Sequence, residues 1–499
     1  MKNTGGYDVV PNPASLIESL RAVGYNLQTA IADLVDNSIT ANAKRVWIRF
    51  FWDGSSSWIS LLDDGCGMSE LELIEAMRIG SKNPCVERAP EDLGRFGLGL
   101  KTSSFSQCRQ LTLSSKLPHE LVKITRWDLD YVMRVNKWTL LDKCIQGADK
   151  CIEPLTHLDH GTLVLWQSLD RIVDLESSSD TQEESRFFDQ ASKVKKYLEM
   201  IFHRFICVSK PELTIYFNGN DNAHKLQPWD PFLETHPATQ PFPEEPIKCA
   251  NGKITVKGFV LPHRDKLGDE LADLAGGINK WNDQQGFYIY RNRRLLVPGD
   301  WLQMWVKDEH CKLARIRVDI PNTMDMEWHI DIRKSRAKPP ANIMKRLKEI
   351  AETIRERAFE VYRYRGTYGP HIEKQPVKRV WLQKMDANGR RCYKIDRKHP
   401  LVRRLSEHDT QPEEYVEPLL KVLEETIPIH TIWLDISKNS DIQAMPFETT
   451  KIPSINKIIM AVYQSLRKIN GYTHKEALEY MQQMDAFILH RNLIDAISE

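Results

Sequence analysis

The segment AIADLVDNSITANAKRV, residues 30–46, places two chemically useful side chains one helical turn apart. Asp33 and Asn37 are separated by four positions, so in a helix they lie one above the other on the same face. The apolar residues between them can pack inward and leave the polar pair facing a cleft. A carboxylate there can activate a water molecule, and an amide oxygen can hold a cation. Taken alone, such a pair near a helix end more often serves as solvated or capping residues.

A second polar position follows an apolar strand in LLDDGCGM, residues 61–68. Asp63 ends this strand, and Gly65 and Gly67 would let the backbone approach a flat ligand closely. A buried carboxylate in this place can accept a hydrogen bond from an exocyclic amine such as that of adenine. Thr162, in the strand-like segment HGTLVLW, offers a hydroxyl that could pair with Asp63 around the same base. The alternative for the DG pair is an ordinary turn.

The glycine-rich segment EDLGRFGLGLKTSSF, residues 91–105, has the composition of a phosphate-binding loop. Gly94, Gly97 and Gly99 precede Lys101, and such loops hold phosphates through backbone N–H groups and a nearby positive charge. The segment is not a Walker A loop, because its lysine comes one residue too late. It also differs from a dinucleotide-binding fingerprint, because no strand directly precedes its first glycine.

The whole composition describes a globular protein without a membrane segment. The 499 residues suggest roughly two to four domains. Charged residues make up 27% and hydrophobic residues 41% of the chain, as in soluble proteins. No run of about eighteen apolar residues and no secretory-type amino terminus are found, which predicts a cytoplasmic protein. The nine cysteines include no CxxC pair, so neither a zinc ribbon nor a disulfide framework is indicated.

The net charge of +1 conceals a separation of charge along the chain. Residues 331–410 contain 22 Lys and Arg side chains against 10 Asp and Glu, whereas residues 174–185 and 412–425 are mainly acidic. A charge-rich segment is usually a solvated face. The basic region could also contact phosphates of DNA, because aromatic residues are interleaved with its cations. These are Tyr362, Tyr364, Tyr368 and Trp381.

The order of elements predicts an α+β fold. A helix is expected over residues 13–40, followed by strands and helices in alternation, which favours a mixed sheet with helices on one side. After Lys210, strand-like segments from ELTIYFNGN onward predict a second α+β region. Residues 341–366 form a long basic amphipathic pattern, a hairpin is expected to turn at Asn388–Gly389, and helices close the chain.

In this order, the motifs resemble the N box and glycine boxes of the Bergerat-fold (GHKL) ATPases, the superfamily of gyrase, Hsp90, histidine kinases and MutL. The resemblance extends over roughly residues 10–205. It implies ATP and Mg²⁺ as cofactors, Asp33 as catalytic base and Asn37 as the metal ligand. It assigns ATP binding to Asn37, Asp63, Gly65, Gly67, Met68, Gly94, Gly97, Leu98, Gly99, Lys101, Thr102 and Thr162.

The superfamily usually has glutamate where this chain has Asp33. Aspartate is one methylene shorter, so to reach the attacking water it needs the helix to lie closer or a second water to bridge. Slow hydrolysis is the resulting hypothesis.

The region after residue 210 resembles the S5-type transducer domain of gyrase, MutL and MORC proteins. GFYIYRNRRLLVPGDW and MEWHIDIRKSRAKPP within it, and GYNLQTAIADLVDNSI before it, resemble prokaryotic MORC-like ATPases, in which aspartate at the base position is expected. The resemblance implies a transducer lysine at the γ-phosphate. Lys334 is the candidate, with a surface role as the alternative and Lys338 close by. The arginines Arg291, Arg293 and Arg294 are either structural or part of a DNA channel.

The resulting domain prediction is an ATPase domain at 1–208, a transducer domain with the long helix at 209–370, and a C-terminal α+β or helical region at 371–499. The resemblance implies an ATP-dependent homodimer that acts on duplex DNA in an anti-phage, restriction-type system, with helicase, nuclease or methyltransferase companions. Two alternatives remain: an Hsp90-like chaperone or regulatory scaffold for protein partners, and a nucleotide-sensing module without turnover. The C-terminal region could dock either a partner or DNA.

Overall fold

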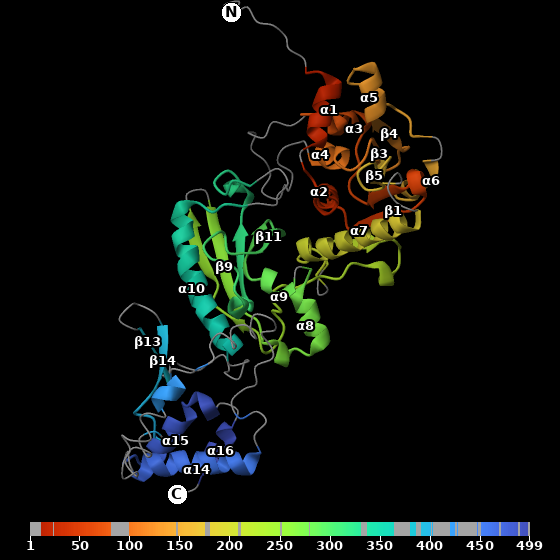
Figure 1. Ribbon diagram of the computed structural model, residues 1–499. Helices are drawn as coiled ribbons and strands as arrows, with labels where there is room; N and C mark the ends of the chain where they lie inside the picture. Colours follow the sequence, from red (N-terminus) through yellow and green to blue (C-terminus); the bar gives the residue numbers. More distant parts are fainter. Residues whose placement is uncertain are drawn as a thin grey trace, which may run out of the picture. The chain divides into compact units, whose positions relative to one another are not determined.

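The computed structural model describes residues 11–22, 24–80, 99–145, 148–174, 180–207, 211–249, 252–278, 280–330 and 337–363, and parts of 380–497. The chain divides into two compact units, Met1–Phe359 and Glu360–Glu499 (Figure 1). Helices and strands alternate in the first unit, so the predicted α+β class is confirmed. Among the described residues, no helix is both long and apolar enough to cross a lipid bilayer.

The first unit contains a mixed six-stranded sheet. Its neighbouring strands are antiparallel except β1 and β6, which are parallel. The strand ELTIYFNGN was expected to open the second region, but it forms β6 and pairs with β1 of this first sheet. Its alternating buried residues, Ile215 and Phe217, complete the apolar face of that sheet. In sheet order the strands are β4 (Lys123–Asp128), β3 (Gln110–Lys116), β5 (Gly161–Gln167), β2 (Trp58–Asp63), β1 (Arg45–Phe51) and β6 (Thr214–Phe217).

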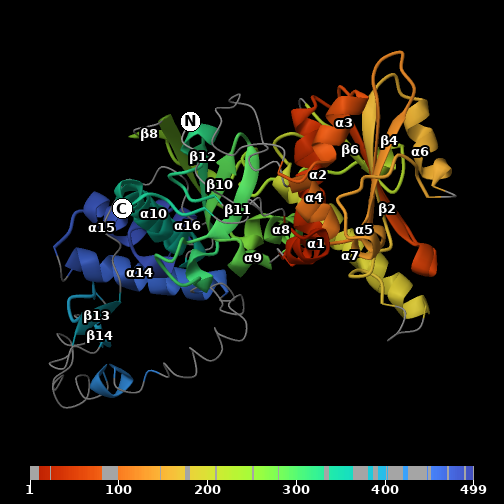
Figure 2. The same cartoon turned by 90° about the horizontal axis from the view of Figure 1, so that it is seen from above.

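Both faces of this sheet carry helices, rather than one face as the sequence suggested. The main core packs the inner face against most of the helices. Figure 2 shows α6 beside the strands, apart from the other helices, and its Ile152 and Leu155 pack on Leu62 and Leu163 of the opposite face. The inner-face helices are α1 (Pro13–Arg21), α2 (Leu27–Thr40), α3 (Glu70–Met77), α4 (Gly99–Phe105), α5 (Leu129–Val135) and α7 (Asp180–Ile201), whereas α6 spans Asp149–Thr156.

The single helix predicted over residues 13–40 is wrong, because the structure has two helices there. Gly24 adopts a φ of 81°, a left-handed conformation that interrupts helix geometry. Asn26 then caps α2 by accepting a hydrogen bond from the Thr29 N–H. The break gives α2 its own direction and makes Asp33 and Asn37 part of a separate helix against the sheet.

A second six-stranded sheet completes the first unit. The long helix α10, Ala341–Arg363, packs on it, and the Ile354 side chain lies where Gly258 of β9 leaves room. The path through this sheet is β11 (Arg294–Asp300), β10 (Gly286–Arg291), β12 (Ala314–Ile320), β9 (Gly252–Val260) and β7 (Gln240–Pro241), with β8 (Glu245–Cys249) also pairing with β9. Two short helices, α8 (Asp269–Gly276) and α9 (Lys280–Asp283), precede β10.

The second unit contains the predicted hairpin and closing helices. Strands β13 (Trp381–Met385) and β14 (Arg391–Ile395) pair antiparallel, which confirms the hairpin, while its turn at Asn388–Gly389 lies outside the described residues. The helices α14 (Ile452–Lys468), α15 (His474–Gln482) and α16 (Arg491–Asp495) share an apolar core of their own.

Candidate functional site

The carboxylate of Asp63 lies at the end of β2 and is 5% exposed. One oxygen accepts a hydrogen bond from the Ser38 hydroxyl at 2.8 Å, and the other accepts from the Gly65 N–H at 2.9 Å. Burial raises the pKa of Asp63 to about 6, although both donors oppose that rise. A carboxylate oxygen can accept more than one hydrogen bond, so acceptor capacity remains for a further donor such as an amine.

Thr162 lies directly opposite Asp63 in the pairing of β2 with β5, while the sharing of a bound base by its hydroxyl and Asp63 stays a prediction. Its hydroxyl is 2.9 Å from that of Ser115 on β3. Ser115 also accepts the Met68 N–H at 2.9 Å, so it connects the glycine turn after β2 to the sheet. Sequence reasoning missed Ser115. The only sequence signal for Ser115 was the alternation of polar and apolar residues in the predicted strand that contains it.

The turn after Asp63 requires glycine at two positions. Gly67 has a φ of 73°, and a Cβ there would lie 2.1 Å from the Lys116 carbonyl oxygen. At Gly65 a Cβ would lie 2.7 Å from the Ala41 side chain. The turn is therefore pressed against both α2 and β3, which are the elements that carry the other candidate residues.

Asp33 is 3% exposed and has a hydroxyl donor beside it. The Tyr25 hydroxyl donates to Asp33 Oδ2 at 2.8 Å. Burial and the negative charge of Asp33 raise the pKa of Tyr25 far above its ordinary value, so Tyr25 keeps its proton and remains a donor. Asn37, one turn further along α2, is exposed. The helix thus presents a buried carboxylate and an accessible amide on one side.

A cation from the second sheet approaches the same carboxylate. Arg294, the first residue of β11, is 1% exposed. Its Nε donates to Asp36 Oδ1 at 2.8 Å, and its Nη2 lies 3.8 Å from Asp33 Oδ1. Burial lowers the pKa of Arg294, but Asp36 and Asp33 outweigh it and hold that pKa above the ordinary value. Arg294 therefore connects α2 of the first sheet to the second sheet.

The two neighbouring arginines also have partners within the protein. Arg291 forms a two-bond pair with Asp325, at 2.7 and 2.8 Å, and Arg293 contacts Glu212 at 2.7 Å. With Arg294, they fit the structural alternative rather than the lining of a DNA channel.

The helix α4 begins next to Asp33. A Cβ at Gly99 would lie 3.6 Å from Asp33 Oδ2. Thr102 is buried, and its hydroxyl bonds that of Tyr25. Lys101 is also buried, and its ammonium group donates to the Ala76 carbonyl at the end of α3. The remaining predicted site residues, Gly94, Gly97, Leu98 and Lys334, lie outside the described residues.

Known proteins share this arrangement of sequence motifs. Residues 25–162 match the family described as "Histidine kinase-, DNA gyrase B-, and HSP90-like ATPase". That segment contains the described part of the site on α2, the turn after β2, α4 and β5, and it ends at Thr162. Residues 25–162 therefore form a GHKL-type ATPase domain, a class that binds ATP.

A more specific similarity lies within the same chain. A stretch of 88 residues is 36% identical to "ATPase morc-1" of Caenorhabditis elegans. The stretch covers 18% of this chain and 10% of the worm protein. This stretch is thus MORC-like, as the sequence motifs indicated, and the chain matches about a tenth of the length of its curated relative.

Proposed function

We propose that this chain binds Mg-ATP and hydrolyses it slowly, with Asp33 as the general base. The observation that carries the proposal is the placement of Asp33, buried beside a tyrosine hydroxyl and an arginine, and directly next to the start of α4. A general base must come within hydrogen-bond reach of the water that it deprotonates. A carboxylate oxygen can accept more than one hydrogen bond, so Asp33 can bond a water molecule as well as Tyr25.

The base-binding end of the site lies at Asp63. Its carboxylate would accept the exocyclic amine of adenine, while Thr162 and Ser115 hold the opposite strands in place. Gly65 and Gly67 let the turn lie against α2 and β3, which fixes the position of Asp63 for the base. The predicted roles of the loop before α4 and of Lys334 at the phosphates remain part of the proposal.

The exposed amide of Asn37 fits a magnesium ion. Mg²⁺ prefers oxygen ligands and usually retains several waters, so one protein oxygen together with phosphate oxygens is a sufficient donor set. The described residues contain no group of three His, Cys, Asp or Glu side chains arranged for a metal. This agrees with a metal held mainly by its nucleotide. When bound, Mg²⁺ would neutralise phosphate charge, and Asn37 would hold it beside α2.

The direct test is Asp33→Asn. The variant keeps the size of the side chain and one acceptor oxygen for Tyr25 but removes the basicity of the carboxylate. We expect turnover of ATP to fall by about 100-fold or more, while binding of a fluorescent ATP analogue stays close to that of the unchanged chain. Undiminished turnover would remove Asp33 from the mechanism.

We further propose that ATP binding promotes dimerisation of the chain and that the dimer acts on duplex DNA. The similarity to a MORC protein supports this proposal. The buried contact between Arg294 and Asp36 also supports it, because it connects α2 to the second sheet. DNA binding through the basic face of α10 should weaken steeply with salt, because phosphate contacts release counterions. Arg355 is a poor target for charge reversal, since it lies over Trp301 and Trp305.

The exposed Lys345 and Lys348 of α10 are better positions. Lys345→Glu and Lys348→Glu should each weaken duplex binding, and the double variant more than either. Turnover measured with and without duplex DNA separates the candidate functions. Stimulation by DNA supports the DNA-acting ATPase, indifference supports an Hsp90-like scaffold, and absence of turnover leaves a nucleotide-sensing module. A role in anti-phage defence rests on the sequence resemblance, and the neighbouring genes would test it.

A further inference from the structure

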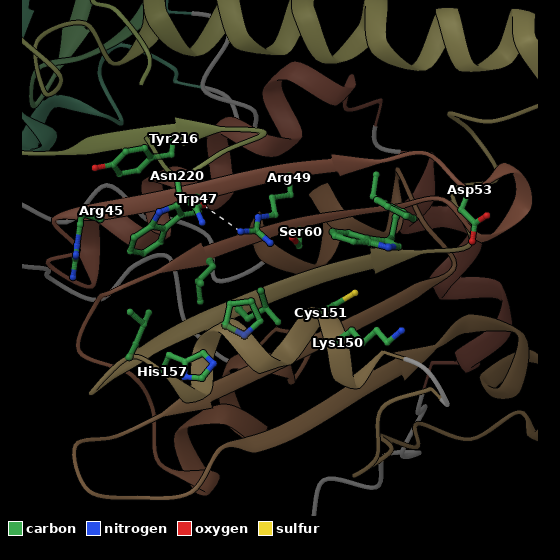
Figure 3. A pocket seen from close by; sticks show the side chains of 16 residues that line it. Arg45, Trp47, Arg49, Asp53, Ser60, Lys150, Cys151, His157, Tyr216 and Asn220 are labelled. Carbon is green, nitrogen blue, oxygen red and sulfur yellow. Dashed lines mark hydrogen bonds between the residues drawn. The ribbon is translucent and has the colours of Figure 1, made fainter. Parts of the chain in front are cut away.

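A second pocket lies on the face of the first sheet that is opposite the nucleotide site. It has a volume of about 740 Å³ and is bounded by α6 and by the outward side chains of β1, β2, β5 and β6. Pockets of roughly 300–1,000 Å³ are typical of small-molecule sites. Figure 3 shows Arg49 on the strand side, with Lys150, Cys151 and His157 on the facing side.

The pocket combines an apolar floor with cations that lack acidic partners. Leu62 and Leu163 form the floor together with Leu158, in the small core under α6. Arg49 donates to the amide oxygen of Asn220 at 3.1 Å, and among the described residues it forms no ion pair with a carboxylate. The Lys150 side chain is exposed and, in the described part of the chain, also lacks such a partner.

Arg45 differs, because Asp64 already pairs with it at 2.8 Å. Asp53 also lines the pocket and is exposed, so the positive charge at Arg49 and Lys150 must outweigh this one carboxylate for an anion to bind.

The Trp, Tyr and Phe side chains of the pocket stack on one another in two pairs, and in one of them Phe51 and Trp58 have centroids 5.1 Å apart. Trp47 and Tyr216 stack on each other with centroids 5.8 Å apart and planes 9° from parallel. The outer face of Trp47 carries the Arg45 guanidinium at 5.2 Å, and Lys225 lies 5.8 Å from the Tyr216 ring. Single-stranded nucleic acid needs free ring faces for its bases. Trp47 and Tyr216 use theirs within the protein, and Phe51 and Trp58 each use one face on the other, which favours a smaller ligand.

We propose that this pocket binds a small organic anion, with an acidic head at Arg49 and Lys150 and an apolar or aromatic body against the leucine floor. Its charge complements the two cations, and its body complements the floor. The proposal concerns the opposite face from the nucleotide site and does not depend on ATP hydrolysis.

The thiol of Cys151 provides a reporter inside the pocket. It lines the cavity and feels the charge of Arg49, which opposes the rise in thiol pKa that burial causes. Cys66 is exposed next to the glycine turn of the nucleotide site and serves as the reference. The probe is 8-anilinonaphthalene-1-sulfonate, an aromatic anion, added to the full chain. Iodoacetamide modification of each cysteine is then followed by peptide mass analysis.

We expect saturating probe to slow modification of Cys151 and leave Cys66 unchanged. Arg49→Gln should weaken probe binding by about tenfold, the scale of one charge-assisted hydrogen bond in a partly enclosed site. Arg134→Gln is the matched control, because Arg134 is an exposed arginine that lies over Tyr131 on α5. It should bind the probe like the unchanged chain. The uncharged analogue N-phenyl-1-naphthylamine should bind more weakly than the anion.

Several outcomes would overturn the proposal. Protection of Cys66 instead of Cys151 would place the probe in the nucleotide site. Equal binding by Arg49→Gln and Arg134→Gln, or by the charged and uncharged probes, would remove the role of the cations. Protection of Cys151 by oligothymidylate but not by the small anion would make this face a nucleic-acid surface. Cysteine protection is measured in the unchanged chain, so the proposal can still be tested if Arg49→Gln does not fold.

Discussion

The buried contact between Arg294 and the two aspartates of α2 yields a quantitative prediction. Arg294→Gln should lower the free energy of unfolding of the first unit by about 3–5 kcal/mol, the range found when one partner of a buried ion pair is removed. Arg294 is 1% exposed, Asp36 1% and Asp33 3%, so solvent cannot replace the lost cation. Glutamine can donate a hydrogen bond to Asp36, but it removes the guanidinium charge that faces two buried carboxylates.

Urea denaturation followed by tryptophan fluorescence measures this loss of stability. The comparison requires that the dependence of the unfolding free energy on urea concentration is the same for all variants. The control is Arg293→Gln, at the adjacent position. Arg293 is 39% exposed and pairs with Glu212, which is 49% exposed. Exposed pairs contribute about 1 kcal/mol or less, so this variant should remain close to the unchanged chain.

The double variant Arg294→Gln/Asp36→Asn tests the pair itself. Asp36→Asn removes the carboxylate that Arg294 contacts most closely, so the two substitutions together should cost less than the sum of the single losses. The expected coupling is about 1–3 kcal/mol. The reasoning is refuted if Arg294→Gln destabilises the protein no more than Arg293→Gln, or if the two single losses simply add.

Three further predictions concern the nucleotide site. ATP affinity should fall as the pH drops through about 6, because burial raises the pKa of Asp63 to about 6. The protonated carboxyl group is a weaker acceptor for the adenine amine. Titrations with a fluorescent nucleotide at several pH values measure the affinity. Inosine triphosphate lacks the amine, so its affinity should not show the same fall. Gly67→Ala should lower the melting temperature far more than Gly80→Ala, although the two glycines have similar φ angles of 73° and 75°. A Cβ at Gly67 would lie 2.1 Å from the Lys116 carbonyl oxygen, whereas no described atom lies within 4 Å of a Cβ at Gly80. Calorimetry of both variants tests this difference.

Local patterns predicted the parts of the site that lie within single elements. The four-residue spacing of Asp33 and Asn37 placed them on one helix, and the apolar run before Asp63 placed that carboxylate at a strand end. Each of these depends on helix or strand periodicity, which a sequence displays directly.

Contacts between distant segments could not be predicted in this way. Arg294 and Asp36 are 258 positions apart, and the sequence around Arg294 only shows a basic turn between two strands. The Tyr25 hydroxyl reaches Asp33 because the chain breaks before α2, a break that the continuous apolar pattern concealed. The sequence placed β6 in the second region for a similar reason. Its alternation of buried residues fits either sheet, and only its pairing with β1 shows that it belongs to the first one.

The two aspartates of α2 share the charge of Arg294 unequally, and this division bears on how Asp33 can act. Asp36 takes the direct hydrogen bond at 2.8 Å, while Asp33 stays 3.8 Å from the guanidinium, which is beyond hydrogen-bond distance. Arg294 therefore supplies a counter-charge to Asp33 from beyond hydrogen-bond distance, while Tyr25 donates to Asp33 Oδ2. Without Asp36, the guanidinium would have Asp33 as its nearest acid and would compete with water for it. The second acid of the DLVDN segment thus holds the guanidinium away from the first. The nearby cation also makes Asp33 a weaker base, which is a physical reason to expect slow turnover.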